Sequence, residues 1–257
     1  LKLVQKPGVR TAGFAGLISG IAHLTKASVL PAVLLAGLLV IARGIYEAWP
    51  TATASGATTA NWKHLVKTMC CSILLLGCFL LVVYPYIRTS KERFGRYFYN
   101  VNSTFYIWYD SWDEVKQGTK AHGDREGWPR MPVDQIPSFR KYVSEHSWHQ
   151  MVSRVFSGFL RVGTTVVLSY GYADFLMVYA IVLIMIFYQN WKILLAYVRA
   201  THMYSIIFVF SYLFFYIILY SWYSPISTGN RFVLSLFLPI MFIILSLLSW
   251  IQEHGLE

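Results

Sequence analysis

The chain has 257 residues, of which 56% are hydrophobic and 13% are charged, and its formal net charge is +10. Soluble globular chains carry about 25% charged residues, so this composition excludes an ordinary soluble domain and favours a membrane protein. The basic residues are spread over short segments between apolar runs, which argues against a nucleic-acid surface.

Apolar runs of about 18 to 20 residues predict helices that cross a membrane. Such runs lie at roughly 9–25, 27–46, 67–88, 170–189, 202–222 and 231–250. The first of them is the weakest, because it is short and rich in glycine. The sequence therefore predicts an all-α integral membrane protein with about six transmembrane helices.

The first two runs are separated at Thr25 and Lys26. A lysine that faces lipid costs a few kcal/mol, so we expect Lys26 to lie at the membrane surface or in a polar cavity. Gly13, Gly16 and Gly20 lie near one face of the first predicted helix, and small residues there allow helix backbones to approach closely. We expect that face to pack on another helix.

Two kinds of segment separate the apolar runs. Residues 50–61 are small and polar, so 48–66 is predicted to be a flexible cytoplasmic linker. Residues 89–152 contain four tryptophans and several turn signals, which is too aromatic for a disordered segment and too long for a simple connection. The sequence therefore predicts three parts, namely helices in 1–88, an aromatic-rich extracytoplasmic cap in 89–168, and helices in 169–257.

The last part of the cap is amphipathic. Apolar residues between 151 and 160 recur at i, i+4 spacing, while the opposite face carries Ser153, Arg154, Ser157 and Arg161. One interpretation is a helix that lies flat in the membrane interface, with its arginines near lipid phosphates. The other interpretation is an ordinary helix packed on the cap.

The basic residues of the short connections predict the orientation of the chain. The side opposite to the cap carries an excess of them: Lys2, Lys6, Arg10, Arg43, Lys63, Lys67, Lys192 and Arg199. The short connections on the cap side carry Lys26 and Arg231. By the positive-inside rule, both termini are predicted to be cytoplasmic and 89–168 to be extracytoplasmic. We expect the membrane to be the inner membrane of a bacterium.

Two motifs and one aromatic segment resemble a known enzyme superfamily. The segment from Gly16 to Pro31 resembles the Gly-Leu-x-x-Gly-Leu-Ala-x-Leu-Thr-Lys helix break of the GT-C superfamily of integral membrane glycosyltransferases, of the aminoarabinose-transferase and protein O-mannosyltransferase type. The segment from Asn230 to Pro239 resembles their Arg-Tyr/Phe-x-x-Pro/Leu-x-x-Pro helix start, and residues 99–112 resemble their external loops. The resemblance covers most of this chain but only the C-terminal half of such an enzyme.

The resemblance implies transfer of a sugar from a polyprenyl-phosphate carrier to an acceptor on the extracytoplasmic side. Arg231 is expected at an outer helix start and Lys26 at the same membrane surface, so these two residues are the candidate ligands of the donor phosphate. Their charges would help the phosphate to leave as negative charge develops on it. The alternative for each residue is an interface anchor whose side chain reaches water.

The cap supplies candidates for contact with the sugar or the acceptor: Trp108, Tyr109, Asp110 and Trp112. Aromatic rings can stack on sugar faces, although Trp and Tyr also gather at membrane interfaces because they are amphipathic. The acids near Asp110 and in 122–126 show no metal-ligand spacing, so we expect no divalent metal. We interpret these acids as loop salt bridges and helix caps, with a carboxylate general base as the alternative.

GT-C enzymes keep their catalytic acid in the first external loop, and nothing before residue 9 can be that loop. We therefore expect the catalytic acid to lie upstream of this chain. The alternative function is a non-catalytic membrane subunit of a larger complex. A transporter is disfavoured, because charges facing a conduction path are nearly absent from the apolar runs. The expected partners are membrane lipids, the polyprenyl-phosphate donor and other membrane subunits, with no nucleic acid.

Overall fold

The computed structural model describes the backbone of residues 1–49, 62–169, 173–201, 203–227 and 229–253. These residues form helices, turns and bends without any strand, which confirms the predicted all-α class. The linker predicted at 48–66 falls largely on 50–61, outside the described residues.

The described chain forms two compact units. The first contains Leu1–Ser90 and Leu195–Tyr212, and the second contains Lys91–Leu194 and Leu213–Glu257. The first unit thus has a boundary close to the predicted division after residue 88. The predicted cap and most of the helical part after it share the second unit.

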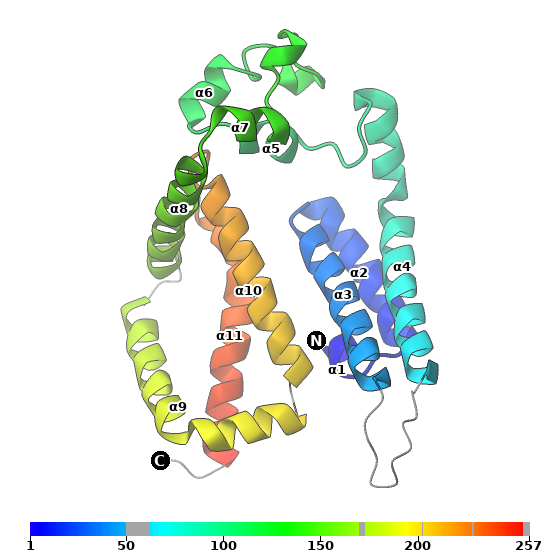
Figure 1. Ribbon diagram of the computed structural model, residues 1–257, viewed down its shortest axis with the longest axis vertical. Helices are drawn as coiled ribbons and strands as arrows, with labels where there is room; N and C mark the ends of the chain where they lie inside the picture. Colours follow the sequence, from blue (N-terminus) through cyan, green and yellow to red (C-terminus); the bar gives the residue numbers. More distant parts are fainter. Residues whose placement is uncertain (50–61, 170–172, 202, 228, 254–257) are drawn as a thin grey trace. The chain divides into compact units, whose positions relative to one another are not determined.

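The first unit begins with α1 (Lys2–Gln5), α2 (Val9–Thr25), α3 (Val29–Ala48) and α4 (Trp62–Phe94), which Figure 1 labels in chain order. The bounds of α2 and α3 match the predicted 9–25 and 27–46 within two residues. Between them, the backbone N–H of Lys26 donates to the Ala22 carbonyl at 2.9 Å, but Lys26 itself is extended (φ −150°, ψ 111°). The predicted helix break is therefore confirmed.

Both α2 and α3 pack on α4 through glycines (Figure 1). A Cβ on Gly16 would overlap with the backbone carbonyl of Leu75, and a Cβ on Gly20 would lie 2.6 Å from the Cβ of Val82. Gly13 has ordinary contacts of 3.9 Å or more, so two of the three predicted glycines make the close approach. From α3, the Gly37 carbonyl accepts a 3.0 Å hydrogen bond from Ser72. The tight packing of small residues replaces the hydrophobic driving force that lipid does not supply.

Arg43 joins three segments of the first unit. Its Nε donates to Glu47 at 2.9 Å, and its Nη1 donates to the backbone carbonyls of Val4 at 2.8 Å and of Gln5. Its guanidinium also lies 4.4 Å from the ring centroid of Tyr204. Arg43 is one of the basic residues that predict the orientation of the chain, and its contacts also give it a structural role in closing the C-terminal end of α1.

The second unit begins with the cap, a series of short helices: α5 (Val101–Thr104), η1 (Tyr106–Trp108), α6 (Trp112–Gln117), η2 (Asp124–Glu126), η3 (Val133–Gln135) and α7 (Phe139–Glu145). Serine side chains define where two of these helices begin. The hydroxyls of Ser111 and Ser138 accept hydrogen bonds from the backbone N–H groups of Glu114 and Lys141 at 3.2 and 3.3 Å. Such caps satisfy amide groups that have no partner within a helix.

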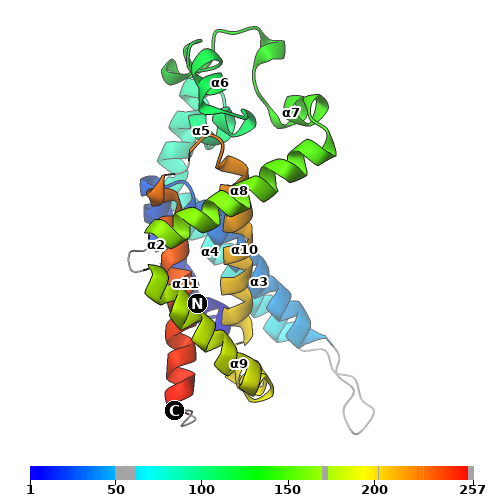
Figure 2. The same ribbon diagram turned by 90° about the vertical axis from the view of Figure 1, so that its left-hand side faces the viewer.

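The helices after the cap are α8 (Trp148–Ser169), α9 (Ala173–Thr201), α10 (Met203–Tyr223) and α11 (Asn230–Glu253). Within the second unit, Figure 2 shows α8 crossing α10 obliquely, and a Cβ on Gly158 would overlap with the backbone carbonyl of Ser221 at this crossing. Tyr220 of α10 and Ser235 of α11 share a 2.6 Å hydrogen bond. These contacts make α8 part of a packed helical group.

An aromatic core connects the cap to the end of α10. Its buried members come from both places: Phe105, Tyr106, Val115, Ile136, Tyr223 and Ile226. Complete burial of one such side chain stabilises a fold by about 1.5–3 kcal/mol relative to leaving it exposed. The cap is therefore a folded structure, as its aromatic content predicts, and the end of α10 completes its core.

Among the described residues, five helices are long and apolar enough to cross a membrane: Val29–Ala48, Trp62–Phe94, Trp148–Ser169, Met203–Tyr223 and Val233–Gln252. The protein is thus a multi-pass membrane protein. The set differs from the six predicted runs in two places: α2 has 17 residues, and the predicted run 170–189 lies partly outside the described residues, where the apolar stretch that can be described is Met177–Ile186. It gains α8, for which the sequence predicted an interfacial helix or a helix packed on the cap.

Candidate functional site

A buried arginine organises the junction between α8 and the cap. Arg154, in the second turn of α8, is only 6% exposed. Its Nη1 donates to Asp110 at 2.6 Å and to the Tyr142 hydroxyl at 2.9 Å, and its Nε donates to the Trp222 carbonyl at 2.9 Å. An unpaired guanidinium in a protein interior costs several kcal/mol, so this set of acceptors is what allows the charge to be buried.

The other contacts of Arg154 extend the junction to the loop before α6. Its Nη2 donates to the carbonyls of Tyr109 at 2.9 Å and of Ile107 at 3.3 Å. The guanidinium also lies 4.6 Å from the Trp222 ring centroid, and the Trp222 indole donates to the Ile107 carbonyl at 3.0 Å. One side chain therefore ties the cap, α8 and the end of α10 together.

Asp110 is the acidic centre of this network. Its Oδ1 accepts from Arg154 and from Tyr142, and its Oδ2 lies 2.7 Å from Nε2 of His146. A carboxylate offers about four acceptor positions, so one remains on Oδ2, and the side chain is 43% exposed. Burial raises the pKa of Asp110, but hydrogen bonds from Tyr142 and His146 and the charge of Arg154 outweigh this and lower the pKa below its ordinary value. Asp110 is therefore an ionised acceptor that solvent can reach.

His146 follows the last residue of α7 and has an acceptor at each ring nitrogen. Its Nδ1 lies 2.9 Å from the Tyr142 carbonyl, while Nε2 faces Asp110. Its ring stacks on the Tyr142 ring, with 3.9 Å between the centroids. Burial lowers the pKa of His146, but the contacts with the Tyr142 carbonyl and with Asp110 outweigh this and raise it. The geometry favours the doubly protonated imidazolium.

An open cleft of about 530 Å³ lies beside this network in the second unit. The polar face of α8, from His149 to Arg161, forms one side of the cleft. Ser224 and Pro225, which follow α10, form another. Asp110 and His146 stand at one end of the cleft. Small-molecule sites typically have volumes of about 300–1,000 Å³. The cleft combines one carboxylate with two arginines and two histidines, so its lining favours an anionic ligand.

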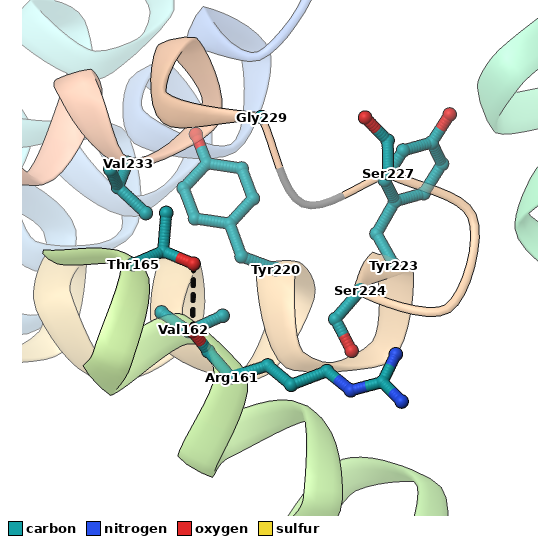
Figure 3. Close-up of a pocket in the computed structure, with 9 residues that line it drawn as sticks. All are labelled: Arg161, Val162, Thr165, Tyr220, Tyr223, Ser224, Ser227, Gly229 and Val233. Atoms are coloured by element: carbon teal, nitrogen blue, oxygen red, sulfur yellow. Dashed lines mark hydrogen bonds between the residues drawn. The ribbon is translucent and has the colours of Figure 1, made fainter. Parts of the chain in front are cut away.

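A second, much smaller pocket lies next to the cleft and shares Arg161 and Ser224 with it. Its volume is about 10 Å³, which is room for about one water molecule. In Figure 3 the Arg161 side chain extends past Ser224, away from Val233 on α11. This pocket is a packing gap between helices, whereas the large cleft is the candidate binding site.

The four predicted sugar or acceptor contacts lie in different surroundings, and Asp110 is the one that lines the cleft. Trp108 packs edge-on against the rings of Phe139 and Trp222. The Tyr109 hydroxyl accepts a 2.9 Å hydrogen bond from the backbone N–H of Thr119. These two aromatic residues have structural roles within the cap.

Trp112 is more exposed. Its ring contacts the Tyr106 ring edge-on and lies 5.0 Å from the ammonium group of Lys120. It is not among the residues that line the cleft. Contact of Trp112 with a sugar stays a prediction, as it does for the other three residues.

The two predicted phosphate ligands belong to different units. Lys26, in the first unit, is exposed at the C-terminal end of α2. Arg231, in the second unit, lies in the first turn of α11, but its side chain is outside the described residues. The phosphate role of both residues stays a prediction.

Two other acids of the cap form local pairs. Asp113 lies 2.8 Å from Lys116, and Glu126 lies 2.8 Å from Arg130. In the part of the chain that the structure describes, no cluster of three or more His, Cys, Asp or Glu side chains is arranged to hold a metal ion.

Tyr142, His146 and Arg154 were not predicted to be site residues. Arg154 was assigned to the polar face of its helix, which is correct, but its burial has no signature in that pattern. The contacts of Asp110 with His146 and Arg154 span 36 and 44 residues. The available signal was an arginine directly before Val155 and Phe156 in a helix with few other charges, which indicates that its charge needs a partner.

The chain was also compared with known proteins. Neither the protein families, nor the curated proteins, nor the solved structures contain a match to it.

Proposed function

We propose that this chain is part of a membrane glycosyltransferase that moves a sugar from a polyprenyl-phosphate carrier to an extracytoplasmic acceptor. In this proposal the cleft beside α8 holds the phosphate end of the donor. The observation that carries the proposal is a cationic cleft on the same helix as an exposed apolar face. Phe156 and Leu160 are 64% and 56% exposed on α8, next to the polar residues that line the cleft.

The cationic residues of the cleft divide into two roles. The donors of Arg154 are engaged with the cap and α10, so this residue supplies charge and fixes the shape of the cleft. Arg161 is exposed and lines the cleft further along α8, towards its C-terminal end. A guanidinium matches two phosphate oxygens at once, so Arg161 is the proposed direct ligand. His149 lines the same cleft and is a second candidate.

The exposed apolar face of α8 suits the other half of such a donor. A polyprenyl chain is an apolar tail that stays in the hydrocarbon layer, while its phosphate stays at the level of the lipid headgroups. Val152, Phe156 and Leu160 offer apolar surface beside the polar cleft on one helix. An amphiphilic donor can therefore contact both faces of α8 at the same time.

Asp110 is suited to orient a hydroxyl group rather than to remove its proton. Its lowered pKa makes it a weak base, but its remaining acceptor position can receive a hydrogen bond from a sugar or acceptor hydroxyl. The proposal keeps the catalytic acid upstream of this chain, as the resemblance implies. It also keeps Lys26 and Arg231 as further candidates for contact with a phosphate.

The proposed location is the inner membrane of a bacterium, with both termini in the cytoplasm and the cap outside. The distribution of lysine and arginine over the short connections supports this orientation. A donor phosphate would then lie at the extracytoplasmic surface, on the side where the cap and the cleft are proposed to be.

The test is the affinity of the purified, membrane-reconstituted chain for a polyprenyl phosphate and for the polyprenol that lacks the phosphate. We expect the phosphate to bind more tightly, and Arg161→Gln to weaken its binding about tenfold, as loss of one charge-assisted contact would. The matched control is Arg140→Gln, on the exposed face of α7 outside the cleft, which should leave the affinity unchanged. Equal affinity of the wild-type chain for the two lipids would reject the proposal and favour a non-catalytic subunit.

A further inference from the structure

We propose that His146 is a proton-dependent positioning residue, whose imidazolium holds Asp110 at the end of the cleft and adds one positive charge to the surface that binds the donor phosphate. Binding of that phosphate then weakens as His146 loses its proton. This inference rests on the proposed function of the cleft.

Each ring nitrogen of His146 faces a hydrogen-bond acceptor. The Tyr142 carbonyl is an acceptor only, so Nδ1 must carry a proton to bond with it. Oδ1 of Asp110 already accepts from Arg154 and Tyr142, which keeps the carboxylate ionised, so Nε2 must also carry a proton. Both contacts exist together only in the charged form of the ring. The positions of the two acceptors alone therefore require the imidazolium form of His146.

The groups around His146 favour the same form. On α7, the helix that precedes His146, Glu145 adds negative charge, and the ammonium group of Lys141 lies 3.7 Å from that carboxylate. Asp110 approaches from the loop before α6. Two residues approach from α8: Arg154, whose charge is balanced by Asp110, and His149, which lines the same cleft. The raised pKa of His146 agrees with this balance.

Loss of the proton changes two things at once. A neutral ring leaves a lone pair facing either the Asp110 carboxylate or the Tyr142 carbonyl, so the stacked ring must move from its position. The lining of the cleft also loses one unit of positive charge. Asp110 is then held by α7 and α8 without its third contact, and its remaining acceptor position is less well oriented.

The experiment measures binding of a polyprenyl phosphate between about pH 5.5 and about pH 8.5, a range that brackets the ordinary histidine pKa of about 6.5. His146→Gln keeps an N–H donor for Asp110 but cannot titrate. Dividing wild-type affinity by that of His146→Gln at each pH cancels the titration of the phosphate itself, which has a pKa near 6. We expect this ratio to fall about fivefold as the pH rises.

Two further variants complete the test. His122→Gln changes an exposed histidine of the cap that does not line the cleft, and it should show the same fall with pH as the wild type. His146→Lys keeps a charge up to about pH 10 and should retain its affinity at alkaline pH, which also covers the case that His146→Gln does not fold. Two results would overturn this inference alone. One is a ratio of wild-type to His146→Gln affinity that stays constant with pH, and the other is a loss of affinity at alkaline pH in His146→Lys equal to that of the wild type. Absence of phosphate binding at every pH would overturn the proposed function as well.

Discussion

The helices of the first unit and the cap of the second unit are held together in different ways. In the first unit, glycines of α2 and α3 lie directly against α4, and the contacts are between backbones and small side chains. In the second unit, one buried arginine collects acceptors that are 12 to 68 residues away in the sequence. Close packing of this kind follows from local sequence, whereas a polar network depends on partners that only the complete fold brings together.

The sharpest test of this comparison is Arg154→Met, which removes the centre of the polar network. It removes the hydrogen bonds that Arg154 donates to Asp110, to the Tyr142 hydroxyl and to three backbone carbonyls, so we expect a loss of about 3–5 kcal/mol in the free energy of unfolding. Arg140→Met, at an exposed position on α7, should change stability by less than about 0.5 kcal/mol. Thermal or denaturant unfolding of both variants in detergent measures the difference, and equal stability of the two would contradict the role of the network.

The corresponding test in the first unit is Gly16→Ala. The new methyl group would meet the Leu75 backbone, which cannot turn away as a side chain can, so we expect a loss of about 1–3 kcal/mol. Gly77→Ala in α4 is the control, because nothing lies within 4 Å of its Cβ position. Alanine there should be neutral or stabilising by up to about 1 kcal/mol. If both variants unfolded alike, the close contact of α2 with α4 would not matter for stability.

Asp110→Asn separates the charge of the network from its shape. The amide keeps the size of the side chain but presents fewer acceptor positions to Arg154, Tyr142 and His146. We expect a loss of about 1–2 kcal/mol, a modest value because the side chain is partly exposed. Asp113→Asn removes a surface pair with Lys116 and should have almost no effect on the unfolding midpoint. A larger loss from Asp113→Asn than from Asp110→Asn would contradict the assignment.

The smallest expected effect is the pH dependence of stability. His146 has a raised pKa when folded, so its contribution is complete below the unfolded value of about 6.5 and is lost as the pH rises through the folded value. Asp110 has a lowered pKa, so its contribution is present above about 3.9 and is lost as the pH falls through the folded value. The wild type should therefore exceed His146→Gln in melting temperature in mildly acidic buffer and lose that advantage in alkaline buffer. A difference that grows with pH would have the wrong sign.

Much of the fold could be predicted from the sequence. The bounds of α2 and α3 follow from apolar runs and the interruption at Lys26, and the close contacts at Gly16 and Gly20 follow from their helical spacing. Among the described residues, the set of helices that could cross a membrane differs from the predicted runs at α8. α8 combines polar and apolar faces, and its length became evident only from its structure.

The candidate site could be predicted less well. Asp110 was predicted to contact the sugar or the acceptor, which stays a prediction, and its partners His146 and Arg154 were not predicted. The reason is physical, since a hydrogen bond between residues far apart leaves no periodic trace in either segment. A buried charge can be inferred to need a partner, but the sequence does not say which residue supplies it.

Photo-crosslinking would test the central proposal most directly, with a polyprenyl phosphate that carries its reactive group beside the phosphate. We predict labelling of the α8 segment between His149 and Arg161, with competition by unlabelled polyprenyl phosphate and not by polyprenol. Labelling confined to other helices, or competition by both lipids alike, would contradict a phosphate site in this cleft.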